Sequence, residues 1–202
     1  FLKYPFLVQN ELLLSLLEKA KNTVFGKEHN FSSIKSYDDF CKSVPIKTYE
    51  EFFPYIQRLR KGEEGILWPG EIKWFAKSAG TTNAKSKFIP ISKEALEDCH
   101  YKAGKDMLAI YCNNHPDTTI FDGKGVMLGG SQDSNPLKKY VDGDLSAILL
   151  ANFPFWVHIH RIPDLETALL SKWEEKLKKI IAQSINENIT NLTGASSWML
   201  IV

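Results

Sequence analysis

Lys77-Ser78-Ala79-Gly80-Thr81-Thr82-Asn83-Ala84-Lys85-Ser86-Lys87 is the stretch around which the rest of this chain is organised. An apolar run at residues 72–76 precedes it, and a second at residues 88–91 follows it. Both runs are short and rich in β-branched or aromatic residues, so they predict two strands joined by a loop. The loop combines hydroxyl side chains, one glycine and three lysines, without an acidic residue. Successive backbone N–H groups in such a turn form a concave anion site, so the stretch predicts a polyphosphate site.

Two interpretations of this loop are open on composition alone. The loop is not a Walker loop, because it has one glycine, a lysine seven residues further on and a strand rather than a helix after it. Serine and threonine are common in turns, so a solvated hairpin turn is the alternative to a phosphate site. The order of the residues favours the phosphate site.

Ser-Ala-Gly-Thr-Thr at residues 78–82, followed by Lys87, resembles the phosphate loop of the acyl-adenylate-forming enzymes, the firefly luciferase-like superfamily. The chain is most similar to the auxin-responsive acyl acid amido synthetase family, in its bacterial branch. The similarity extends over nearly the whole chain, through residues 74–78, 85–90, 121–125, 128–131 and 143–146.

This resemblance implies an enzyme that activates a carboxylic acid with ATP and Mg²⁺, forms an acyl-adenylate, and transfers the acyl group to an amine such as an amino acid. It implies that Lys87 is catalytic and pairs with the phosphates. The residues that would wrap the phosphates are Ser78, Ala79, Gly80, Thr81 and Thr82. Two positions depart from the family pattern: Ala79 replaces a second serine of many relatives, and Ala195-Ser196 replaces Val-Pro.

Later motifs of the family are absent from these residues. They include the acidic motif for magnesium and adenine, so no Mg²⁺ ligand is identified, and the motif that holds the ribose. The first residue is Phe1 and the last residues are apolar. We therefore expect an N-terminal fragment that is inactive alone. Transfer to coenzyme A instead of an amine, and a non-catalytic nucleotide-binding module, are the alternatives.

Composition excludes several classes. The 202 residues include 25 basic and 24 acidic ones, so the charge gives no argument for nucleic acid or a membrane surface. The apolar run at residues 12–17 is far shorter than the ~20 residues of a membrane span. Cys41, Cys99 and Cys112 form no Cys-x-x-Cys pair, which favours a reduced, cytoplasmic protein. The sequence does not indicate an oligomeric state.

The pattern of apolar residues predicts two parts. Residues 1–65 predict a helical segment, with helices over 7–24, after Ser36, and from Thr48 to Gly62, where Thr48-x-x-Glu51 forms a capping box. Residues 66–202 predict a partial, mixed α/β adenylation domain in which strands alternate with helices. The expected helices lie at residues 92–111 and 144–151, with the longest at 163–187.

Two further groups of residues are candidate sites. His158-x-His160 is expected in an extended stretch with both rings on one face, but no third ligand is evident, so structural histidines are favoured and no metal site is predicted. Phe153, Phe155 and Trp156 could line an apolar acyl pocket, although core packing is the more common role of such a cluster.

Overall fold

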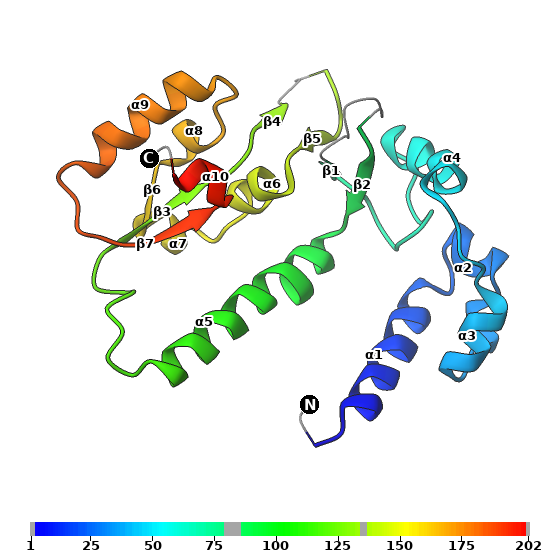
Figure 1. Ribbon diagram of the computed structural model, residues 1–202. Coiled ribbons are helices and arrows are strands. Elements are labelled where there is room, and N and C mark those ends of the chain that lie inside the picture. Colours follow the sequence, from blue (N-terminus) through cyan, green and yellow to red (C-terminus); the bar gives the residue numbers. More distant parts are fainter. Residues whose placement is uncertain (1–2, 79–85, 134–136, 201–202) are drawn as a thin grey trace. The chain divides into compact units, whose positions relative to one another are not determined.

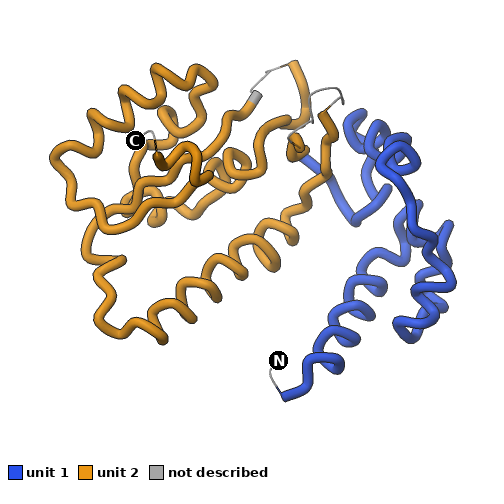
Figure 2. The backbone as a smooth tube through the Cα atoms, viewed as in Figure 1, with its two compact units in different colours: residues 1–73 blue, residues 74–202 orange. Residues whose placement is uncertain are grey.

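The structure is a computed structural model that describes residues 3–78, 86–133 and 137–200 (Figure 1). The chain divides into two compact units, Phe1–Lys73 and Trp74–Val202 (Figure 2). The described part of the first unit contains only helices. The second contains two small sheets and the remaining helices, which makes the fold mixed α/β, as expected.

Helices of the first unit begin and end where local signals place them. They are α1 (Pro5–Ala20), α2 (Val24–Glu28), the 3₁₀ turn η1 (Phe31–Ser33), α3 (Tyr37–Ser43) and α4 (Tyr49–Arg60). The capping box is present, since the Thr48 N–H donates to Glu51 at 2.7 Å while the Thr48 hydroxyl accepts from the Glu51 N–H. Gly62, at φ +87°, ends α4, and the N–H groups of Gly62 and Glu63 donate back to the carbonyls of Leu59 and Arg58 in its last turn.

Two boundaries in this unit differ from the sequence expectation. The first helix ends at Ala20, because the buried Thr23 caps a separate helix α2. Residues 66–73 contain no strand. Instead the Ile66 carbonyl accepts from the Phe25 N–H, and the Ile66 side chain is buried in the first unit. The expectation of strands from residue 66 was therefore wrong, and the first strand begins at Trp74.

A four-stranded sheet in the order β2-β1-β5-β4 carries the central loop. Strands β1 (Trp74–Lys77) and β2 (Phe88–Ile91) form the expected antiparallel hairpin. Strand β5 (Val141–Gly143) pairs parallel to β1, and β4 (Gln132–Asp133) pairs antiparallel to β5. Ala76 and Ile91 of this sheet pack against Leu96 and against Ile148 of helix α6 (Leu145–Ala151).

A second sheet contains three parallel strands in the order β6-β3-β7. They are β3 (Lys124–Leu128), β6 (Arg161–Ile162) and β7 (Ile189–Gly194). Helix α9 (Trp173–Ser184) buries Ile180 against this sheet, and α10 (Ser196–Met199) adds Trp198 and Met199 to the same cluster. The remaining short helices are α7 (Phe155–Ile159) and α8 (Leu165–Ala168).

One predicted helix changes type along its length, and another is divided in the structure. The helix expected at residues 92–111 is a π-helical segment η2 (Ala95–Tyr101) followed by α5 (Lys102–Asn114). The helix expected at 163–187 is wrong as a single element, because the chain leaves the helix after α8 and re-enters it at α9. Lys176 explains this break. Its ammonium lies 2.6 Å from the Ala168 carbonyl, whereas residues eight apart in a continuous helix are about 12 Å apart along the axis.

Candidate functional site

Ser78 and Lys87 close the base of the central loop. The Ser78 N–H donates to the Lys87 carbonyl at 2.8 Å, and the Lys87 N–H donates to the Ser78 hydroxyl at 3.2 Å. These two bonds extend the ladder of the β1–β2 hairpin by one residue pair. Two residues predicted to contact phosphate therefore lie opposite each other across the hairpin. Ala79, Gly80, Thr81 and Thr82 lie outside the described residues.

Parallel pairing brings a second loop to the same edge of the sheet. Ala76 of β1 is level with Gly143 of β5, so Ser78 and Asp144 both follow strands that end at one edge. Ligands in α/β proteins bind outside the carboxyl ends of parallel strands. This edge is therefore the expected place for a substrate.

The turn Gly129-Gly130-Ser131, which follows β3, is bonded to the start of α6. The Ser131 N–H donates to Asp144 Oδ2 at 2.9 Å, and the Asp144 N–H donates back to the Ser131 carbonyl at 2.9 Å. The Gly130 N–H donates to the Ser146 hydroxyl at 2.9 Å. Position 130 requires glycine, because a Cβ there would lie 2.1 Å from Asp144 Oδ2.

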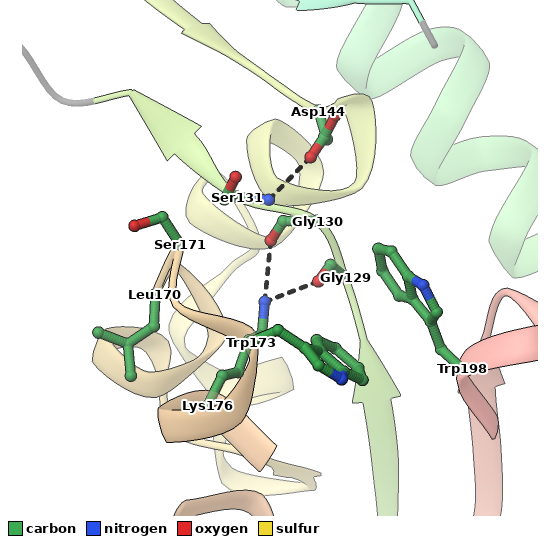
Figure 3. A pocket seen from close by; sticks show the side chains of 9 residues that line it. All are labelled: Gly129, Gly130, Ser131, Asp144, Leu170, Ser171, Trp173, Lys176 and Trp198. Atoms are coloured by element: carbon green, nitrogen blue, oxygen red, sulfur yellow. Dashed lines mark hydrogen bonds between the residues drawn. The ribbon is translucent and has the colours of Figure 1, made fainter. Parts of the chain in front are cut away.

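Lys176 is a buried lysine at the centre of this arrangement, with 2% of its surface exposed. Its ammonium donates to the carbonyls of Gly129 at 2.7 Å, Gly130 at 2.9 Å and Ala168 at 2.6 Å; Figure 3 shows the two glycine bonds. Burial lowers the pKa of Lys176, and the nearby Asp144 carboxylate partly opposes that shift. The lysine thus joins the turn after β3 to the end of α8.

A pocket of about 360 Å³ opens above this lysine (Figure 3). The glycine turn and Asp144 line it on one side, and Leu170 and Ser171 on another. Trp173 and Trp198 supply most of its aromatic surface, with ring centroids 5.1 Å apart. The pocket is mainly apolar, with a few polar groups, as is usual for small-molecule sites.

Comparison with known proteins identifies the family. Residues 1–199 match the GH3 family N-terminal domain. The chain belongs to the GH3 family.

Two curated relatives of this GH3 chain come from plants. It is 33% identical over 91 residues to a probable indole-3-acetic acid-amido synthetase GH3.1 of Arabidopsis thaliana, covering 45% of this chain and 15% of that protein. It is 32% identical over 91 residues to the jasmonoyl-L-amino acid synthetase JAR6 of Nicotiana attenuata, covering 45% and 16%. The matched region thus spans less than a fifth of these relatives. The bacterial branch stays a prediction.

Solved structures show the same fold. The GH3.15 acyl acid amido synthetase matches with a TM-score of 0.61 at 17% identity, over 84% of this chain and 30% of that one. A second structure, AtGH3.15 acyl acid amido synthetase in complex with 2,4-DB, matches with a TM-score of 0.54 at 20% identity, over 94% and 29%. These matches confirm the expected α/β fold of the acyl-adenylate-forming type.

The aromatic residues predicted to line an acyl pocket do not line the pocket above Lys176. Phe153 packs on Tyr101, with ring centroids 5.2 Å apart, whereas Phe155 and Trp156 are 78% and 51% exposed. Of the three, only Phe153 is partly buried. Tyr101 donates its hydroxyl to the Leu149 carbonyl, and burial raises its pKa to about 12.

His158 and His160 of the GH3 chain do not share a strand face as expected. His158 lies in α7 and His160 follows that helix, because residues 155–159 are helical rather than extended. His158 Nδ1 accepts from Arg161 Nε at 3.0 Å, and burial followed by the Arg161 charge lowers the pKa of His158. Across residues 3–78, 86–133 and 137–200, no three His, Cys, Asp or Glu side chains form a metal site, and no helix is long and apolar enough to span a membrane.

Lys176 and the pocket were missed at the level of sequence. The sequence contained one indication that Lys176 is buried. It lies three residues after Trp173 and four before Ile180, on the helix face that those residues bury. A lysine on that face needs buried acceptors. The acceptors are the carbonyls of Gly129, Gly130 and Ala168, which lie 47, 46 and 8 residues before Lys176 in the chain.

Proposed function

We propose that this GH3 chain supplies the phosphate loop of an ATP-dependent acyl acid amido synthetase. In this reaction a carboxylate attacks the α-phosphate of ATP and displaces pyrophosphate. An amine then attacks the acyl carbon, AMP leaves with the bonding electrons, and the amine loses a proton. Negative charge increases on the departing pyrophosphate, so preorganised N–H donors and a lysine accelerate the first step.

The observation that supports this proposal most directly is the hairpin base formed by Ser78 and Lys87. It lies at the carboxyl end of β1, beside the parallel strand β5. We assign the phosphates to Ser78, Ala79, Gly80, Thr81 and Thr82, with Lys87 as the catalytic cation. Each charge-assisted hydrogen bond contributes about 1.5–3 kcal/mol.

The substrates are assigned by class. ATP acts with Mg²⁺, whose ligands we place outside these 202 residues. The acid is an aromatic or fatty carboxylate, and Phe153, Phe155 and Trp156 form part of its binding surface. The exposure of Phe155 and Trp156 leaves two aromatic side chains available for it. The free cysteines support a cytoplasmic location.

Residues 1–65 and 66–202 correspond in this proposal to a helical segment and a partial adenylation domain. The chain alone does not complete the reaction, because the later motifs of the family are absent from it. Acyl-dependent ATP–pyrophosphate exchange by the 202-residue chain would contradict this part of the proposal.

Isothermal titration of the chain with ATP–Mg²⁺ tests the phosphate loop. Lys87→Ala is expected to weaken affinity roughly tenfold to a hundredfold, because at least one charge-assisted bond is lost. Lys102→Ala is the matched control, since Lys102 is an exposed lysine of the same unit, on α5. An affinity in Lys87→Ala equal to that of the control excludes Lys87 from the site.

If the wild-type chain gives no heat, it does not bind ATP–Mg²⁺, which contradicts the proposed phosphate loop and favours a degenerate module that only packs. The other alternative, transfer to a thiol such as coenzyme A, is separated by product analysis. A longer GH3 protein that contains this chain is supplied with an acid, ATP, and either an amino acid or coenzyme A. Amide formation supports the proposal, and thioester formation alone contradicts it.

A further inference from the structure

We propose that the pocket above Lys176 binds the amine acceptor, as a primary ammonium group attached to an apolar or aromatic body. This assignment rests on the proposed amide-forming function. It is argued from three features of the pocket: its position, its charges and its aromatic walls.

The pocket lies at the same edge of the sheet as the base of the proposed phosphate loop. Asp144 lines the pocket and directly follows β5, whose last residue Gly143 is level with Ala76 of β1. Ser78 follows β1 at the same edge, so the base of the phosphate loop and the mouth of the pocket lie at the ends of neighbouring strands. An amine held there is close to the place where an acyl-adenylate would form.

The hydrogen-bonding groups left in the pocket favour a ligand that donates hydrogen bonds. An ammonium has three N–H donors, and all three of Lys176 are used by backbone carbonyls. The N–H groups of Lys176 are therefore committed to the protein and are not available to a ligand carboxylate or phosphate. Within the part of the chain that the structure describes, the Asp144 side chain accepts one hydrogen bond, at Oδ2 from the Ser131 N–H, whereas a carboxylate can accept about four. The remaining acceptor capacity in the pocket is anionic and suits an ammonium group.

The walls suit the apolar part of the same ligand. Trp173 and Trp198 line the pocket with their rings tilted at 39° to each other. Indole faces attract cations and pack against aromatic or aliphatic groups. The hydroxyls of Ser131 and Ser171 add neutral hydrogen-bonding groups at the rim. A free carboxylic acid fits less well, because Lys176 has no N–H group left to donate to it.

NMR of the 202-residue chain tests the assignment. The five tryptophan indole N–H signals are followed during titration with 2-phenylethylamine. Two control ligands have the same ring and linker: 3-phenylpropanoate carries a carboxylate, and 2-phenylethanol is neutral. Trp173→Phe and Trp198→Phe assign the two signals of the pocket. We expect the amine to shift these two signals, and the carboxylate to bind at least tenfold more weakly.

Variants separate the charge from the shape of the pocket. Asp144→Asn keeps the acceptor for Ser131 and should weaken amine binding at least tenfold. Asp106→Asn, at an exposed position on α5, should leave it unchanged. Trp198→Leu, which removes one aromatic wall without touching the Asp144 hydrogen bonds, should also weaken binding.

Three NMR results would overturn the assignment: no shift with the amine, shifts confined to Trp68, Trp74 or Trp156, or carboxylate binding as tight as amine binding. The assignment is also wrong if Asp144→Asn and Trp198→Leu both bind the amine as tightly as the wild type. A parallel titration with ATP–Mg²⁺ separates this inference from the proposed function. Loss of amine binding with ATP binding intact contradicts the pocket alone. Loss of ATP binding with amine binding intact contradicts the proposed function and leaves an amine site without an acceptor role.

Discussion

Replacement of Lys176 by methionine removes the cation that joins the turn after β3 to the end of α8. Methionine is unbranched and flexible, so it can fill most of the volume of the lysine stem. The change therefore leaves packing nearly intact and removes the three hydrogen bonds to Gly129, Gly130 and Ala168. The effect on stability reports those bonds.

The magnitude follows from two opposing contributions. Each buried carbonyl left without a donor costs about 1–3 kcal/mol, so three of them cost about 3–9 kcal/mol. The variant also avoids the desolvation cost of burying an ammonium group, which offsets several kcal/mol of that loss. We expect a net decrease of about 2–4 kcal/mol in the free energy of unfolding, and a melting temperature lower by roughly 5–12 °C.

Urea unfolding followed by tryptophan fluorescence measures this decrease. Four of the five tryptophans, including Trp173 and Trp198 beside the lysine, belong to the Trp74–Val202 unit. Lys178→Met is the matched control, since Lys178 is exposed on the same helix α9. If Lys176→Met unfolds within about 0.5 kcal/mol of this control, the buried bonds do not hold the turn, and the structural account of the pocket is wrong.

Three further substitutions test the second unit. Burial and then the Arg161 charge lower the pKa of His158 in the folded chain. The unfolded chain therefore takes up a proton near the ordinary histidine pKa of about 6.5, and the folded chain does so only at lower pH. The free energy of unfolding should consequently fall as the pH drops below about 6.5. His158→Gln should flatten that slope in urea titrations between pH 7.5 and 5, and an unchanged slope would assign the effect to other groups. Gly130→Ala should lower the free energy of unfolding by about 1–3 kcal/mol, because the new Cβ would overlap Asp144. Gly104→Ala lies in open space on α5 and should raise it by about 0.5–1 kcal/mol. Calorimetric melts measure both changes. Equal effects of the two substitutions would show that the close approach at Gly130 does not constrain the turn.

Features set by neighbouring residues could be predicted from the sequence. The capping box of Thr48 depends on a partner three residues away, and the helix stop at Gly62 depends on one left-handed residue. The β1–β2 hairpin follows from two apolar runs around a polar loop. In each case the interacting groups are close along the chain, so the pattern of residues nearly fixes the geometry.

Predictions that assumed one regular element through a stretch were wrong where distant residues intervened. The apolar periodicity at 163–187 continues through the break between α8 and α9, so the pattern gives no sign of it. In the folded chain, the bond from Lys176 to Ala168 requires that break. The extended stretch expected around His158 is a short helix, beyond which Arg161 bonds to the histidine.

The sequence by itself determined the family, the mixed α/β class and the position of the loop at residues 77–87, because these depend on the order and spacing of neighbouring residues. Only the tertiary structure decided that Asp144, Lys176 and Trp198 line one pocket. These residues come from three helical regions, and parallel strand pairing with a buried ammonium brings them together. Contacts across such separations depend on how the whole unit packs, which local spacing does not specify.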